Sequence, residues 1–124
     1  MFVTRVIGEN GLRRKDGGFD LDIRLPWYRA LPLSTVEIAD LKVDGQAIDK
    51  SRITFEVNAK TFTLDELINH PEEVWFVLDS AFLHVKDTPL SAAAEHDVDL
   101  IVGLYPPYIP GFHRLTECKK RLTA

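Results

Sequence analysis

A period of two in the placement of apolar residues is the feature that most restricts what this chain can fold into. In residues 19–25, four apolar side chains at odd positions alternate with two aspartates and an arginine. Residues 53–57 and 97–104 show the same kind of alternation. Because successive side chains of a strand point to opposite faces, each segment predicts a β-strand with one face in the core and one in solvent.

Turn-forming residues separate the predicted strands. Residues 15–18 read Lys-Asp-Gly-Gly and open the strand that follows. Asp44 and Gly45 predict a tight hairpin that returns through Ile48, and residues 58–60 predict a second short hairpin. Turns at this spacing are typical of a fold made of short antiparallel strands.

The phase of the apolar pattern changes once. Between residues 35 and 43 the apolar positions shift from even to odd numbers, which predicts a β-bulge near Ala39 and Asp40. Residues 74–85 hold two further strand-like runs, with a break expected at residues 79–80. The sequence therefore predicts seven or eight short strands.

One segment has helical features. Thr63 and Glu66 have the spacing of a capping box, and an apolar stripe follows before Pro71. This predicts one short helical segment near residues 64–69.

Short strands without a regular alternation of strands and helices predict an all-β fold. The expected architecture is an antiparallel β-sandwich, immunoglobulin-like in general architecture, with a closed barrel as the alternative. Residues 1–124 are expected to form a single domain. Within it, residues 105–124 are expected to be a loop rich in proline and aromatic residues, followed by a basic C-terminal tail.

Composition and charge limit the classes of function. The 124 residues include 15 basic and 19 acidic side chains, a net charge of −4, so a broad electrostatic grip on nucleic acid is not expected. No run approaches the ~18 consecutive apolar residues of a membrane span, and the N-terminal residues lack the apolar core of a signal peptide. Cys118 is the single cysteine, which excludes an internal disulfide and every cysteine-based zinc motif. We expect a cytoplasmic protein that binds neither nucleic acid nor a membrane.

No pattern in the sequence indicates catalytic or metal-binding residues. His96 is in phase with the apolar face of its predicted strand, whereas Asp97 and Asp99 point the other way, so these three cannot share an ion. His84 stands between two apolar residues and is expected to face solvent. Cys118 is expected to lie in the polar tail without a role. We therefore expect no catalytic residue, no metal ligand and no cofactor in this chain.

Two segments carry side chains that are costly to expose. Residues 26–34 and residues 105–114 contain tryptophan, tyrosine, phenylalanine and arginine on proline-stiffened loops. Either the loops bind a partner or they cap the ends of the core, and both interpretations remain open. Because such residues are enriched at interface hot spots, binding is favoured over chemistry, and a partner is expected to bury Trp27 and Tyr28. The candidate residues for a partner interface or substrate entrance are Trp27, Tyr28, Arg29, Leu31, Tyr105, Pro107, Tyr108, Pro110, His113 and Arg114.

The first of these segments also carries a family resemblance. Residues 28–37 (YRALPLSTVE) resemble the Y-R-x-L-P-L-S signature of the small beta subunits of bacterial C-glycoside deglycosidases. Further pieces follow in the order expected for that family, over about residues 5–110. They are VDG at 43–45, ITFEVN at 53–58, KTFTLDEL at 60–67, WFVLD at 75–79, EHDV at 95–98 and YIP at 108–110.

The resemblance implies a protein that works within a complex. In that family a larger alpha subunit, similar to TIM-barrel sugar-phosphate isomerases and epimerases, carries a divalent metal (manganese or magnesium) and the acid–base residues. The small subunit is a β-sandwich bound near the mouth of that site. The complex cleaves the C–C bond between an aromatic aglycone and a 3-oxo sugar by elimination, since the carbonyl acidifies the neighbouring C2 proton.

Two hypotheses about function follow. In the first, this chain supports assembly of the C-glycoside deglycosidase and shapes its active-site entrance, while the alpha subunit performs the chemistry. The alternative is a free-standing β-sandwich module that binds carbohydrate or peptide, with Trp27 and Tyr28 as an aromatic platform.

Overall fold

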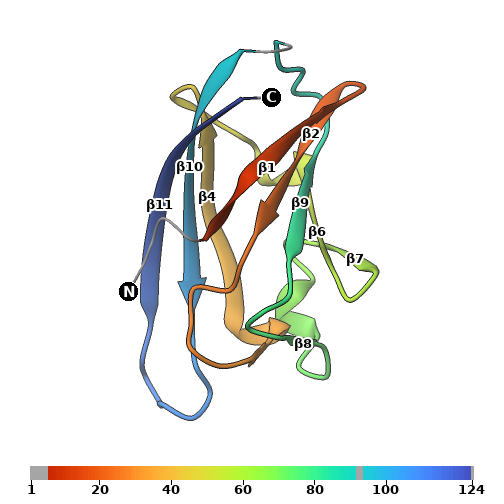
Figure 1. The fold of residues 1–124 in the computed structure, drawn as a ribbon. Helices are drawn as coiled ribbons and strands as arrows, with labels where there is room; N and C mark the ends of the chain where they lie inside the picture. The colour runs from red at the N-terminus through yellow and green to blue at the C-terminus, as the bar shows by residue number, and fades with distance from the viewer. Residues whose placement is uncertain (1–5, 92–93, 124) are drawn as a thin grey trace.

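Two antiparallel sheets packed face to face form the body of the protein (Figure 1). The computed structural model describes residues 6–91 and 94–123. Its strands are β1 (Ile7–Lys15), β2 (Gly18–Ile23), β3 (Leu31–Pro32), β4 (Val36–Val43), β5 (Gln46–Ala47), β6 (Ile53–Val57), β7 (Lys60–Thr63), β8 (Val74–Trp75), β9 (Ala81–Val85), β10 (Glu95–Leu104) and β11 (Arg114–Thr123). One sheet has the order β1-β2-β9-β6-β7, the other has the order β11-β10-β4-β5, and β3 pairs with β8.

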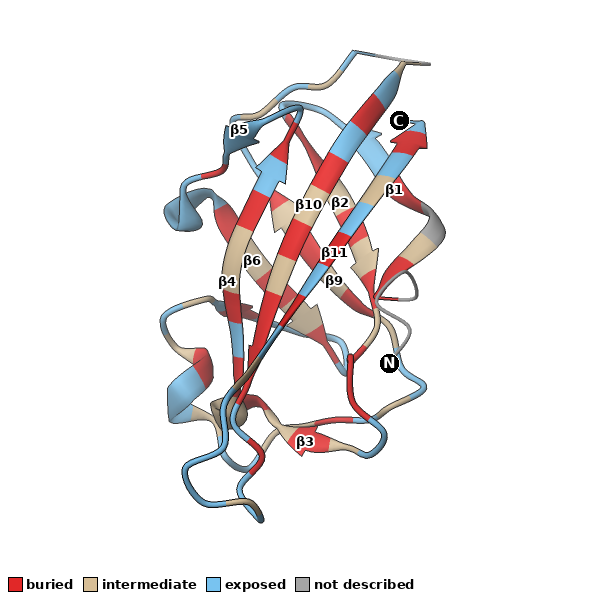
Figure 2. Cartoon of the chain, turned by 90° about the vertical axis from the view of Figure 1, so that its left-hand side faces the viewer, coloured by how far each residue is buried: buried red, intermediate tan, exposed pale blue. Residues whose placement is uncertain are grey.

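The predicted all-β sandwich is confirmed. Buried positions alternate along β4, β10 and β11, which face the viewer in Figure 2. Across the core, Phe19 of β2, Phe55 of β6 and Leu83 of β9 are fully buried. Burial of each such side chain contributes roughly 1.5–3 kcal/mol to folding. Within the described residues no ladder joins β1 to β11, so the sheets remain separate and the barrel alternative does not form.

The predicted bulge is also confirmed. In the β10–β4 ladder Ile101 pairs with Asp40, whereas the next residue, Val102, pairs with Ile38. Ala39 is therefore the extra residue of β4. This extra residue allows Ile38 and Leu41 to point into the same core, although they are three positions apart and would lie on opposite faces of a regular strand.

Both predicted hairpin turns have the backbone that two-residue hairpins require. Asp44 and Gly45 have φ values of 53° and 81°, and Asn58 and Ala59 have φ values of 55° and 61°. Two consecutive residues with positive φ match the right-handed twist of the strands that they connect. The break expected at residues 79–80 is found too, between β8 and β9.

The expectation of a C-terminal tail is wrong for Arg114–Thr123. These residues form β11, which pairs with the whole length of β10, from Arg114 opposite Leu104 to Thr123 opposite Glu95. The inward positions of β11 include Thr116, Cys118 and Leu122, of which only one is a large apolar residue. The two-residue period was therefore too weak to be read from the sequence, and only the neighbouring β10 reveals the strand.

The helical segment expected near residues 64–69 is shorter than predicted. Only the 3₁₀ helix η4 (Leu67–Asn69) is formed there, alongside η2 (Leu33–Thr35) and η3 (Lys50–Arg52) elsewhere. The backbone N–H of Thr63 donates to Glu66 Oε1 at 2.7 Å, which is one half of a capping box. The segment of seven residues between Thr63 and Pro71 is too short for a stable α-helix. Only one residue of η4, Leu67, is buried, so packing adds little further stabilisation. No helix among the described residues has the length and apolar character needed to cross a membrane.

Candidate functional site

Large exposed hydrophobic side chains collect at one end of the sandwich. At this end β2 and β10 finish, and β4, β9 and β11 begin; it is the lower end in Figure 1. We call it the loop end, and define it as residues 24–30, 76–80 and 105–113, together with η2, η4 and the start of β11. All eight exposed large hydrophobics identified among the described residues lie there: Tyr28, Ile68, Phe76, Leu78, Tyr105, Tyr108, Phe112 and Leu115. Exposed hydrophobic side chains gathered at one end of a domain are typical of an interaction site.

The two loops singled out in the sequence meet at the loop end. The indole Nε1 of Trp27 donates a hydrogen bond to the Tyr108 hydroxyl at 2.5 Å. The same hydroxyl lies 3.3 Å from that of Tyr28. The Arg29 guanidinium stands 4.7 Å from the centre of the Tyr108 ring, within the range of a cation–π contact. The loops thus form one continuous surface.

Trp27 differs from its predicted role. Its side chain is only 8% exposed in this chain alone, and its ring packs 5.1 Å from Tyr28 and 6.0 Å from Phe112 between ring centres. Its own fold therefore buries Trp27, because the 105–113 loop folds back over it. The expectation that a partner buries Trp27 is wrong, whereas Tyr28 is 67% exposed and remains available. A platform made of both rings does not exist on the surface.

The other candidate residues divide between surface and core. Leu31 is fully buried in β3, opposite Trp75, so it supports the loop end from below and is not accessible. Arg29, Pro107, Pro110 and His113 are exposed, while Tyr105 and Tyr108 are each 42% exposed and Arg114 is half-buried. Both interpretations of the loops are thus partly right, since some residues cap the core and others face outward.

Glu37 is a member of this surface that sequence reasoning missed. The Tyr105 hydroxyl donates to Glu37 Oε1 at 3.3 Å, and the Tyr105 ring stacks on the His113 ring with centres 4.1 Å apart and planes 7° apart. Partial desolvation and the nearby Glu37 carboxylate raise the pKa of Tyr105. An outward-pointing glutamate in a strand has no special signal in one sequence, and only the register of β4 on β10 places it here.

The family model for the C-glycoside deglycosidase beta subunit matches residues 2–108. The chain belongs to this family. The matched range includes both the residue 24–30 loop and the first half of the 105–113 loop.

Individual relatives extend the match. The 3'-dehydrocarminate deglycosidase beta subunit of a Microbacterium species is 41% identical over 110 residues, which cover 89% of this chain and 83% of the relative. A C-glycoside deglycosidase beta subunit of Microbacterium trichothecenolyticum is 40% identical over 109 residues (88% and 82%). That of Arthrobacter globiformis is 40% identical over 124 residues (99% and 94%), so its similarity includes β11.

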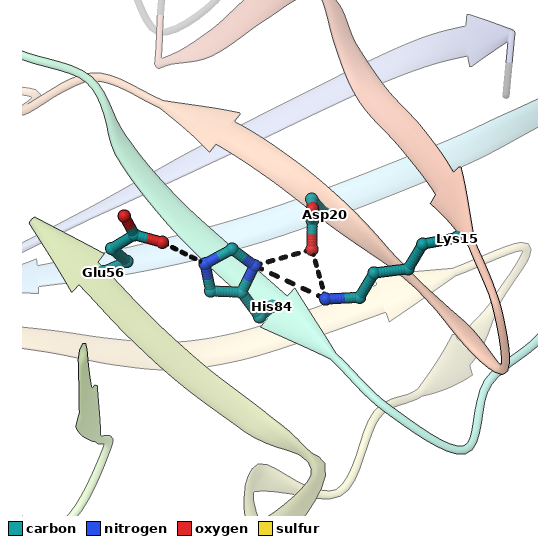
Figure 3. Close-up of polar contacts among 4 residues, drawn as sticks. All are labelled: Lys15, Asp20, Glu56 and His84. Atoms are coloured by element: carbon teal, nitrogen blue, oxygen red, sulfur yellow. Dashed lines mark hydrogen bonds and ion pairs between the residues drawn. The ribbon is translucent and has the colours of Figure 1, made fainter. Parts of the chain in front are cut away.

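A separate polar cluster crosses the outer face of the five-stranded sheet (Figure 3). His84 Nδ1 lies 2.6 Å from Asp20 Oδ1, His84 Nε2 lies 2.6 Å from Glu56 Oε1, and Lys15 Nζ lies 2.6 Å from Asp20 Oδ1. Although partial burial alone would raise the pKa of Asp20, hydrogen bonds from Lys15 and His84 lower it. Both ring nitrogens of His84 thus lie within hydrogen-bond distance of a carboxylate. The cluster ties strands together, and His84 faces solvent as predicted.

A pair made of one histidine and one aspartate lies at the opposite end of the sandwich from the loop end. His96 is buried, as its phase predicted, and its Nδ1 lies 2.7 Å from Asp44 Oδ2. Asp44 Oδ1 also accepts from the backbone N–H of Asp97 at 2.9 Å. The hydrogen bond with Asp44 raises the pKa of His96 and lowers that of Asp44. The described residues hold no group of three or more His, Cys, Asp or Glu side chains arranged to bind a metal ion.

Proposed function

We propose that this chain is the small subunit of a heteromeric C-glycoside deglycosidase and that it docks on a larger alpha subunit through its loop end. One observation carries the proposal: the eight exposed large hydrophobics lie at one end of the sandwich, in a chain whose family is named as a beta subunit. An apolar surface of this kind is stabilised when a partner removes it from water. Its prolines restrict the loop before binding, which reduces the entropy lost on docking.

In this proposal the alpha subunit is a TIM-barrel protein that performs the chemistry. The substrate is a 3-oxo-C-glycoside, and the complex removes the aromatic aglycone by elimination after loss of the proton at C2. A divalent metal, manganese or magnesium, held by the alpha subunit would supply Lewis-acid stabilisation of the negative charge that develops in this reaction. In this proposal its ligands belong to the alpha subunit.

The loop end then forms part of the entrance to the active site. Tyr108 and His113 are partly or fully exposed and stand on the 105–113 loop, which suits them to line the path of an aromatic aglycone. Arg29 and Tyr28, on the neighbouring loop, make contacts with the alpha subunit. The complex acts in the cytoplasm.

Co-expression tests the proposal directly. The chain is expected to co-purify with a TIM-barrel alpha subunit, and C-glycoside cleavage is expected only when both are present. Tyr28→Ala and Leu78→Ala, both exposed at the loop end, should weaken assembly at least tenfold, as loss of hot-spot residues does. Gln46→Ala, exposed at the other end of the sandwich, is the matched control and should have no effect. Unchanged assembly in both loop-end variants would contradict the proposal.

A further inference from the structure

A hollow of about 370 Å³ lies between β4 and η4, next to the loop end. The chain from β7 to η4 supplies an apolar wall of Leu64, Leu67 and Ile68, while Glu37 and Tyr105 line the side of the four-stranded sheet. The remaining lining residues are Ser34, Val36, Ile38, Lys50 and Asp65. Ile68 and Tyr105 also belong to the exposed hydrophobics of the loop end, so the hollow is continuous with the proposed docking surface.

Three charged side chains line the hollow. Of the lining residues, Glu37 and Asp65 are acidic and Lys50 is basic. Across residues 6–91 and 94–123, none of the three takes part in an ion pair. The one hydrogen bond that Glu37 accepts there comes from the Tyr105 hydroxyl. A carboxylate only accepts hydrogen bonds and has about four lone-pair sites, so Glu37 can accept further hydrogen bonds.

Gly103 permits this position of Glu37. The two residues are opposite each other in the β10–β4 ladder. A Cβ added at Gly103 would lie 2.8 Å from Glu37 Oε1 and 3.4 Å from His113 Nε2. Any other residue at this position would push the end of the Glu37 side chain away. The carboxylate therefore lies over the strand, beside Tyr105, because β10 has no side chain there.

We propose that a lysine or arginine side chain of the alpha subunit enters this hollow and pairs with Glu37; the inference rests on the docking proposed above. The hydrocarbon stem of a basic side chain packs along Leu64, Leu67 and Ile68, and its charged end supplies the donors that Glu37 lacks. A neutral apolar side chain would instead desolvate the carboxylate without giving it a donor.

Three variants of the full-length chain test the sign of the partner's charge. Glu37→Gln should weaken assembly with the alpha subunit at least tenfold at low salt and flatten its salt dependence, because an ion pair is lost. Glu37→Lys should weaken it further, since like charges then meet. Glu117→Gln is the matched control on an exposed position of β11 and should stay within twofold of the unchanged chain. Isothermal titration at two salt concentrations gives the affinities, and kcat is measured at saturating beta subunit.

The outcomes separate this inference from the docking proposal. If Glu37→Gln binds the alpha subunit with unchanged affinity, the inference of a basic partner side chain is overturned. Loss of assembly in Tyr28→Ala would still support docking in that case. Equal weakening by Glu37→Gln and Glu37→Lys without a change in salt dependence would show a neutral hydrogen bond in place of an ion pair. A change in kcat at unchanged affinity would assign Glu37 to the substrate. Each of these three results contradicts the inference, and docking fails only if the Tyr28 and Leu78 variants also assemble normally.

Discussion

The indole nitrogen of Trp27 donates to the hydroxyl of Tyr108 at 2.5 Å, across 81 residues of sequence. This hydrogen bond joins the loop after β2 to the loop between β10 and β11. Because Trp27 is buried while Tyr108 is 42% exposed, the bond ties the outer loop to a core side chain, and Tyr28 and Tyr108 still face outward.

Truncation of Trp27 should therefore act on folding. We expect Trp27→Ala to lower the free energy of unfolding of the isolated chain by about 3 kcal/mol, as loss of a core aromatic does. Urea unfolding followed by circular dichroism measures it. Tyr28→Ala is the control, since its ring is mostly exposed, and should change stability by less than about 0.5 kcal/mol. Equal stability of the two variants would show that Trp27 does not belong to the core.

Removal of a single oxygen tests the link between the loops. Tyr108→Phe leaves the Trp27 indole N–H without its acceptor, at a cost of about 1 kcal/mol. We also expect faster hydrogen exchange in residues 105–113, measured by mass spectrometry. Tyr105→Phe keeps the Trp27 bond and serves as the control; an identical exchange pattern in both variants would show that the bond does not restrain the loop.

The stability contributed by Asp44 and His96 should depend on pH. The pKa of His96 is raised above its ordinary value of 6.5, so its contribution is present below pH 6.5 and is lost as the pH rises through the higher folded-state pKa. The pKa of Asp44 is lowered below 3.8, so its contribution is present above pH 3.8 and is lost as the pH falls through the folded-state value. Asp44→Asn should thus lower Tm most between about pH 4 and 6.5.

Thermal scans at pH 5.5 and pH 9 measure the difference. We expect a loss of a few degrees at pH 5.5 and a smaller loss at pH 9. Asp97→Asn removes the carboxylate of an exposed pair with Arg121 and is the control, with little effect at either pH. A loss of Tm in Asp44→Asn that is equal at both pH values would rule out the charged pair as its cause.

Thr116 offers a stabilising substitution. Its Oγ1 is buried without a hydrogen-bond partner in the part of the chain that the structure describes. Thr116→Val replaces the hydroxyl by a methyl group of similar size and should raise the free energy of unfolding by about 1 kcal/mol. Thr123→Val, at an exposed position of the same strand, is the control and should be nearly neutral. A destabilised Thr116→Val would indicate that the hydroxyl has a partner after all.

Cys118 should react slowly in the folded protein. Desolvation of the buried thiol raises its pKa, so little thiolate is available to a thiol reagent. We expect labelling by a disulfide reagent to proceed at the rate of unfolding or local opening, and to become fast in urea. Rapid labelling of the native chain would contradict the burial of β11 against the core.

Features that depend on neighbours in sequence could be predicted without the structure. The strands of residues 19–25 and 53–57, the hairpin at Asp44 and Gly45, and the bulge at Ala39 all follow from local periodicity or from backbone preference. The family resemblance was equally accessible, because it rests on the order of short sequence pieces.

Residue pairings distant in sequence were decided only by the tertiary structure. β11 forms because β10 offers it a ladder, although its inward residues are too weakly apolar to reveal the strand. Trp27 is buried because a loop 81 residues later folds over it. Glu37 lies beside Tyr105 of the loop end because the register places Gly103 opposite it. The sequence alone determined the strands with a clear apolar alternation and the turns between them, since those follow from local sterics. Which side chains cap the core and which face a partner depended on how distant segments pack.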